Sequence, residues 1–292
     1  MLISFNLVHE TARRLRFVII VFVSALVFSS CAALQPPNVT GPPGKNSLYP
    51  ILLIEDADRK EATLAALNRF GRLSGKSNGA QPQLQPVTGT ILSLPAQASG
   101  FLFLPKVGAA ATMNEEETRE SLRRFIRDWQ ELIGSDPAKL SLIERTDLPD
   151  GSKLANYQQR PFRYPIRGNY GKLEIHFTGD RRVVNLTSSC IPDADRIQSA
   201  LSALNVRPRS EETLQKLRAR GLTYVDAQGI ERTFAIPPSN EMTARQMTIY
   251  ILPAKDQPNA LEFHLAWEIE FTNAPIKLAY IDALNGEVVA TE

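Results

Sequence analysis

The chain has 292 residues, enough for one large hydrophobic core or two smaller ones. Its 43% hydrophobic, 22% charged and 8% aromatic residues are typical of a globular protein. The net charge of +2 lies in the first 30 residues, since removing their three arginines and one glutamate from the totals of 33 and 31 leaves 30 basic and 30 acidic side chains. A neutral remainder gives no electrostatic support for binding nucleic acid, and we expect no nucleic-acid partner.

The first thirty residues have the pattern of an export signal. Arg13, Arg14 and Arg16 precede an apolar run of 12 residues at 17–28. A helix of this length spans about 18 Å, well short of the roughly 30 Å hydrocarbon core of a bilayer. We therefore predict a signal peptide over residues 1–30 that is cleaved on export, in preference to a permanent transmembrane helix.

A cysteine follows this segment directly. The small residues Ser29 and Ser30 before Cys31 resemble a bacterial lipobox, in which that cysteine becomes the lipidated first residue of the mature protein. Ordinary cleavage nearby, for example after Ala32, is the alternative. Lipidation of Cys31 predicts a protein that is exported to the bacterial cell envelope and held on the periplasmic face of a membrane by its N-terminal lipid.

The next two segments carry little sequence pattern. Residues 31–47 are rich in proline, glycine and asparagine, which predicts a flexible tether. We treat residues 48–112 as an N-terminal subdomain of uncertain fold. Within them, 57–73 has a helix-forming composition, and 90–94 and 101–104 are short apolar runs typical of strands.

The clearest helix begins at Asn114. Its side chain can cap the helix N-terminus, Glu117 stands in the capping-box position, and Gly134 ends the run. Apolar residues follow at helical spacing, namely Leu122, Phe125, Ile126, Trp129 and Ile133. We predict that this stripe packs in the core across a hairpin at 172–186; a partner-binding face is the alternative.

That hairpin consists of two short strands. Residues 173–178 alternate apolar and polar side chains, Gly179-Asp180 has turn chemistry, and 183–186 is the returning strand. Cys190 follows, and without Cys31 it has no cysteine to pair with. We predict a small buried side chain there; a catalytic or intermolecular role is the alternative.

The C-terminal third continues with alternating helices and strands. We predict helices over 196–205 and 210–220, and strands at 222–225, 233–236 and 246–252.

The longest alternation in the chain covers residues 261–271. Its odd positions are apolar and predict a central antiparallel strand with a helix over it. Its even positions carry three glutamates and His264, which we interpret as a solvated face; a metal or acid/base site at His264 is the alternative. An Asn285-Gly286 turn then predicts a final hairpin.

The order of these segments is similar to a propeptide architecture. Tyr-Gln-Gln at 157–159, a proline-containing segment, a strand bearing His176 and Phe177, a Gly-Asp turn and Ile-Pro-Asp at 191–193 look like the FTP module. That module occurs in the propeptides of fungalysin- and thermolysin-type metallopeptidases. Trp-Glu-Ile-Glu at 267–270 and Ile-Asp-Ala-x-x-Gly-Glu-Val at 281–288 look like the PepSY-like module that follows it.

The resemblance covers roughly residues 114–292 and implies a fold class. It implies an α+β protein with antiparallel sheets, each covered by helices, in two modules. The FTP-like module would occupy residues 113–193, and the PepSY- or cystatin-like module residues 194–292.

The catalytic signature of those peptidases is missing. Their zinc site needs two histidines one helical turn apart with a glutamate between them. The one His-Glu pair in the chain, His9-Glu10, lies inside the predicted signal peptide. The resemblance therefore implies a propeptide without its enzyme, with no catalytic residues, no metal ligands and no cofactor.

The function implied by the resemblance is binding. We expect a non-enzymatic lipoprotein that binds a protein partner, foremost a secreted metallopeptidase, as an inhibitor or chaperone in trans. The acidic face of residues 261–271 and the adjoining hairpin are where we expect docking. One alternative is an envelope scaffold or assembly lipoprotein that has reused the fold for unrelated binding. Another is an enzyme that uses Cys190 or a His–Glu pair.

Overall fold

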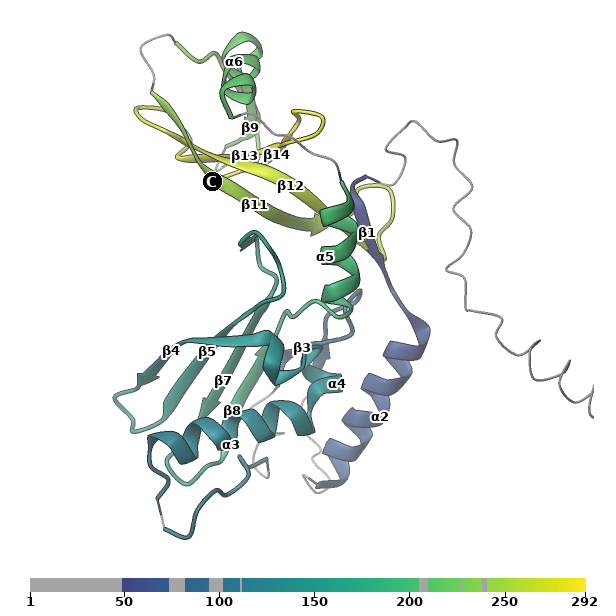
Figure 1. The fold of residues 1–292 in the computed structure, drawn as a ribbon, viewed down its shortest axis with the longest axis vertical. Helices are drawn as coiled ribbons and strands as arrows, with labels where there is room; N and C mark the ends of the chain where they lie inside the picture. The colour runs from purple at the N-terminus through teal and green to yellow at the C-terminus, as the bar shows by residue number, and fades with distance from the viewer. Residues whose placement is uncertain are drawn as a thin grey trace, which may run out of the picture. The chain divides into compact units, whose positions relative to one another are not determined.

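The computed structural model describes residues 49–73, 82–94, 102–110, 112–204, 210–226, 228–237 and 241–292. They form an α+β fold with several antiparallel sheets, as predicted (Figure 1). The predicted signal peptide, the tether and Cys31 lie outside the described residues. None of the helices in the described ranges is long and apolar enough to cross a membrane.

A four-stranded antiparallel sheet contains the predicted hairpin. Its order is β4-β5-β7-β8, with the strands β4 (Leu140–Asp147), β5 (Lys153–Gln159), β7 (Lys172–Phe177) and β8 (Val183–Ser188). Ile175 pairs with Leu186 across β7 and β8. In the turn between them, Arg181 has the positive φ of 74°, so the left-handed position falls just after the predicted Gly179-Asp180 pair.

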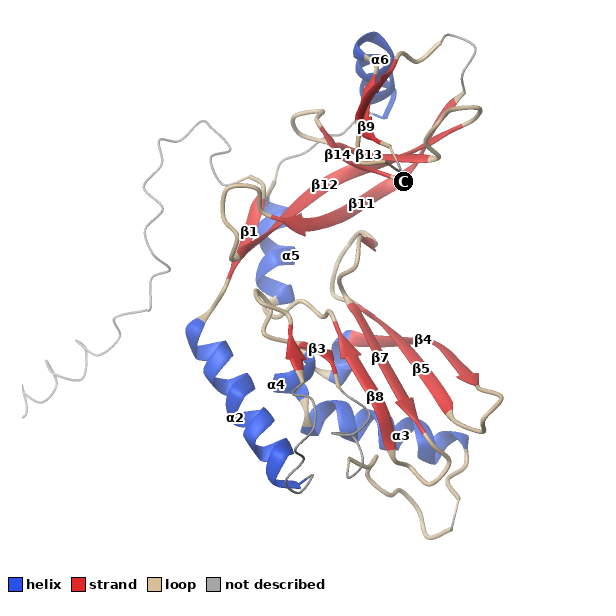
Figure 2. Cartoon of the chain, turned by 180° about the vertical axis from the view of Figure 1, so that it is seen from behind, coloured by secondary structure: helices blue, strands red, loops and turns tan. Residues whose placement is uncertain are grey.

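Helix α3 (Glu115–Asp128) lies on one face of this sheet (Figure 2). The capping box is formed as predicted, because Asn114 accepts a hydrogen bond from the Glu117 amide at 2.9 Å and Glu117 accepts one from the Asn114 amide at 2.9 Å. The helix is interrupted at Trp129 and continues as α4 (Gln130–Ile133) up to Gly134, whose φ is 78°.

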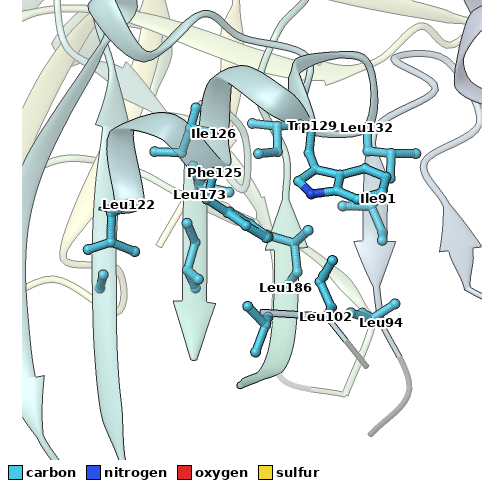
Figure 3. Close-up of a cluster of buried hydrophobic side chains, with 14 of the residues drawn as sticks. Ile91, Leu94, Leu102, Leu122, Phe125, Ile126, Trp129, Leu132, Leu173 and Leu186 are labelled. Carbon is cyan, nitrogen blue, oxygen red and sulfur yellow. The ribbon is translucent and has the colours of Figure 1, made fainter. Parts of the chain in front are cut away.

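The apolar stripe of this helix is core, as predicted. Its five predicted residues are all at most 7% exposed. Phe125 and Ile126 pack toward the sheet residues Leu173 and Leu186 (Figure 3). Burying side chains of this size stabilises by about 1.5–3 kcal/mol each.

The second large sheet has six strands in the order β14-β13-β12-β11-β6, with β1 paired to β12. The strands are β1 (Ile51–Ile54), β6 (Ile166–Arg167), β11 (Met242–Pro253), β12 (Ala260–Phe271), β13 (Leu278–Asp282) and β14 (Val288–Thr291). All pairs are antiparallel except β6 with β11. The 261–271 alternation is thus a central strand, as predicted.

Two helices cover the apolar face of β12. Helix α5 (Ala194–Ala203) shares a core with Leu261 and Phe263, and α6 (Ser210–Arg220) shares one with Ile269 and Phe271. The small hairpin β9 (Leu222–Val225) and β10 (Glu231–Phe234) packs with α6. Strand β10 begins two residues before the predicted position, because the Asp226 carboxylate accepts hydrogen bonds from the Gln228 and Ile230 amides and closes the turn early.

The described residues of the predicted subdomain at 48–112 are shared between the two large sheets. Strand β1 pairs with β12, whereas α2 (Ala57–Leu73), β2 (Gln83–Leu84) and β3 (Ile91–Ser93) lie with α4 and the four-stranded sheet. These residues complete other cores and do not form a subdomain of their own. The physical reason is that three short strands and one helix have too few apolar side chains for an independent core.

Candidate functional site

The face of β12 that we expected to be solvated is largely buried. Ala266 is fully buried and Glu268 is 2% exposed, while the side chain of His264 is 12% exposed. Only Glu270, at the end of the strand, has a side chain that is half exposed. The prediction of an exposed acidic docking face is therefore wrong. Side chains from distant parts of the chain cover and neutralise it.

One buried polar cluster joins the start of the fold to its C-terminal hairpin. The Tyr49 hydroxyl donates to Oδ2 of Asp282 at 2.6 Å and accepts from the amide of Leu265 at 3.0 Å. Nδ1 of His264 lies 2.8 Å from the same Oδ2, and its Nε2 lies 3.1 Å from Oε2 of Glu262. We call Tyr49, Glu262, His264 and Asp282 the His264 cluster.

The surroundings of this cluster favour a positively charged His264, a negatively charged Asp282 and a neutral Tyr49. Burial opposes the charge on His264, but hydrogen bonds to Asp282 and Glu262 outweigh it and raise its pKa above the ordinary value. Burial likewise opposes the charge on Asp282, but hydrogen bonds from His264, Tyr49 and two backbone amides lower its pKa. Burial and the neighbouring Asp282 raise the pKa of Tyr49, so its hydroxyl stays protonated and donates.

A buried ion pair occupies the other half of the same face. Oε2 of Glu268 is 2.6 Å from Nε of Arg167, which reaches it from β6. Nη1 of Arg245 is 3.7 Å from the other carboxylate oxygen. A buried carboxylate needs such partners, because an unpaired one would cost several kcal/mol.

Cys190 and His176 both have surroundings that indicate a structural role. Cys190 is fully buried, as predicted, and burial raises the pKa of its thiol to about 12, which disfavours the reactive thiolate. Nε2 of His176 lies 2.6 Å from the Ser152 hydroxyl, which donates to Asp150 at 2.5 Å. In a catalytic triad the carboxylate accepts a hydrogen bond from the histidine. Here the Asp150 carboxylate accepts one from Ser152 instead, so the three groups do not have the order of a triad. The contacts fix the β4–β5 turn.

A groove lies between α3 and the β4 edge of the four-stranded sheet, with a volume of about 330 Å³. Its apolar residues are Ile126, Pro137, Leu140, Leu142 and Tyr157. The polar residues, all from α3, are Glu116, Arg119, Glu120 and Arg123. Sequence reasoning missed this groove, because no local pattern shows that β4 stands at the edge of its sheet.

A tyrosine lines this groove. Tyr157 is 9% exposed as a whole residue, but its hydroxyl is not a buried atom that lacks a partner; among the described residues that holds only for Nε1 of Trp267. Burial raises the pKa of Tyr157 against the opposing charges of Arg119 and Arg145, so the hydroxyl is a proton donor. The Tyr157 hydroxyl can therefore donate a hydrogen bond to an acceptor on a segment that enters the groove.

Strand β4 also has a free backbone edge. In the described part of the chain it pairs with β5 alone. The register shifts between Leu142 and Glu144, which takes Ile143 out of the pairing and leaves it 59% exposed. An edge of unpaired amides and carbonyls beside an apolar groove can accept an extended polypeptide as an additional strand.

No group of three or more His, Cys, Asp or Glu side chains in the described ranges is placed to hold a metal ion. Scans against family models and curated proteins gave no match. A search of solved structures found the crystal structure of an uncharacterized protein from Eubacterium rectale ATCC 33656, with 12% identity and a TM-score of 0.31, over 82% of this chain and 84% of that one. The fold defines the class, an α+β protein, and its described residues form a groove between α3 and β4. The FTP and PepSY resemblance stays a prediction.

Proposed function

We propose that this chain is an exported lipoprotein, similar to a metallopeptidase propeptide, that binds a protein partner without catalysing a reaction. Its first candidate partner is a secreted metallopeptidase, which it would inhibit or chaperone in trans. The order of the FTP- and PepSY-like motifs supports the choice of partner. The observation that carries the binding function is the free edge of β4 beside the groove under α3.

The groove fits an extended polypeptide segment. Backbone groups of the incoming segment would pair with β4, and one apolar side chain would lie on Leu140 and Leu142. A carbonyl of the segment would accept from the Tyr157 hydroxyl. Acidic and basic side chains of α3 alternate along the rim, so they favour register and orientation more than net affinity.

The test is capture of partners from envelope extract by the immobilised full chain, with mass spectrometry of the eluate. The variants are Tyr157→Phe, which removes only the hydroxyl, and Ile143→Lys, which places a charge on the β4 edge. Val225→Lys is the matched control, because Val225 is 62% exposed on the separate β9–β10 hairpin. We expect Ile143→Lys to lose the captured partner, Tyr157→Phe to retain less of it than the parent, and the control to retain it fully.

The captured protein decides between the two binding functions. A metallopeptidase whose activity falls when the chain is added would support the propeptide-like function. Structural envelope proteins without a peptidase would favour the scaffold. Equal capture by Ile143→Lys and Val225→Lys would exclude the groove as the binding site.

Membrane attachment through Cys31 is part of the same proposal. The positive segment, the short apolar run and the small residues before Cys31 support it. Metabolic labelling with a radioactive fatty acid should mark the parent chain and leave Cys31→Ser unlabelled. Equal labelling of both chains would show that the lipid is not on Cys31.

A further inference from the structure

We propose that His264, protonated on both ring nitrogens, clamps Tyr49 and strand β1 to the sheet, and that the clamp weakens as the pH rises. This proposal is independent of the groove and of the partner. It concerns Tyr49 and the edge of β12 to which β1 is paired.

The geometry requires both protons. Each ring nitrogen of His264 faces a carboxylate oxygen, Oδ2 of Asp282 at 2.8 Å and Oε2 of Glu262 at 3.1 Å. A carboxylate only accepts hydrogen bonds, and a neutral imidazole has one donor and one acceptor nitrogen. In either neutral tautomer, one nitrogen lone pair would face a carboxylate. Only the imidazolium satisfies both contacts.

Among the described residues, the titratable groups that face His264 bring no second positive charge to these carboxylates. The titratable groups that face it are Glu262 on its own strand, Asp282 on β13, Tyr49 ahead of β1, and Tyr250, which lies opposite it on β11. All four are acids. The proton on His264 is therefore the single positive charge that opposes the two carboxylates, Glu262 and Asp282, within the described cluster.

Tyr49 depends on the same atoms. Its hydroxyl and Nδ1 of His264 share Oδ2 of Asp282, and the two rings meet edge to face with centroids 5.8 Å apart. The other oxygen of Asp282 is held by the amides of Leu284 and Asn285. Loss of the His264 proton turns one contact repulsive and displaces the ring that supports Tyr49.

The pKa shifts of His264 and Asp282 determine how the strength of the clamp changes with pH. The pKa of His264 is raised in the fold, so the clamp is complete below the unfolded value of about 6.5 and is lost as the pH rises through the folded value. The pKa of Asp282 is lowered, so its contribution is lost only on strong acidification. The clamp is strongest between these limits.

Release of β1 would uncover an apolar edge. Ile51 and Leu53 are 8% and 1% exposed and pair with Phe263 and Leu261 of β12. When β1 opens, this edge of β12 gains unpaired backbone next to apolar side chains, which is a surface for strand addition.

The test is hydrogen exchange of the full chain, followed at the β1 amides of residues 51–54 between pH 5.5 and 8.5 and corrected for intrinsic exchange. We expect opening of β1 to become about tenfold more frequent across the titration, the size of one lost charged hydrogen bond. The amides of the β7–β8 hairpin serve as the internal control, and their corrected exchange should not change over this pH range.

Two variants separate the clamp from general destabilisation. His264→Gln should abolish the pH dependence of β1 opening while β7–β8 stays protected. Glu262→Gln keeps a hydrogen-bond acceptor but removes one charge, so the midpoint should move to lower pH. Protection of β1 that does not vary with pH in the parent, or that varies equally in His264→Gln, would overturn the proposal.

Discussion

The hydroxyl of Tyr49 lies 2.6 Å from Oδ2 of Asp282, a residue 233 positions further along the chain. This contact joins the first described strand to the C-terminal hairpin. Asp282 belongs to the Ile-Asp-Ala motif of the PepSY-like resemblance, whereas Tyr49 lies outside that resemblance. The N-terminal segment is thus part of the same sheet that the C-terminal motif builds.

The first prediction tests this contact by Tyr49→Phe. The change removes a donor from Asp282 and an acceptor from the Leu265 amide, so we expect a loss of about 1–3 kcal/mol in the free energy of unfolding. Urea unfolding would show it as a lower midpoint at unchanged slope. Tyr157→Phe is the control, because it removes the same group from a tyrosine that lines a surface groove, and it should change the free energy of unfolding by less than about 0.5 kcal/mol.

The second prediction concerns the stability of the variant Asp282→Asn as the pH falls. Because the pKa of Asp282 is lowered in the fold, the carboxylate stabilises the protein above its unfolded pKa of about 3.9 and loses this effect as the pH falls through the folded value. The variant should be less stable than the parent at pH 6, and thermal unfolding should show the difference shrinking toward pH 2.5. Glu270→Gln, at the half-exposed end of the same face, is the control, and its stability should change with pH as that of the parent does.

The third prediction compares the two arginines at Glu268. Arg167→Ala leaves the buried Glu268 carboxylate with one distant partner, Arg245. Because Arg167 is about one-third exposed and its charge is partly screened by solvent, we expect the free energy of unfolding to fall by roughly 2 kcal/mol. Arg245→Ala removes a longer, half-exposed contact and should cost under about 1 kcal/mol. In a Glu268→Gln background the Arg167→Ala cost should fall. An unchanged cost there would show that the arginine acts through packing.

The fourth prediction concerns Gly134, where α4 ends. Its φ is 78°, and a Cβ there would meet Cγ2 of Thr90 at 2.4 Å, so Gly134→Ala should cost roughly 3 kcal/mol from left-handed strain and overlap together. Gly151 has a φ of 79° with open space around it, and Gly151→Ala should cost only about 1–2 kcal/mol. Chemical denaturation of both variants gives the comparison. Adding Thr90→Ser to Gly134→Ala should recover the difference, because serine lacks that methyl group.

Local chemistry accounts for the elements that were predicted well. The α3 helix begins where Asn114 and Glu117 form reciprocal hydrogen bonds, an interaction within four residues. The β7–β8 hairpin follows from alternation and a turn. The groove was not predicted, since its walls, α3 and β4, become neighbours only through the strand order β4-β5-β7-β8.

The sequence by itself determined the faces of β12, since alternation decides which side chains share a side of a strand. Only the tertiary structure decided that its polar face is buried. Tyr49 comes to His264 from the N-terminus and Arg167 comes to Glu268 from β6, 101 positions away. A buried charge is tolerated only where such partners arrive, and their arrival depends on the packing of the whole chain.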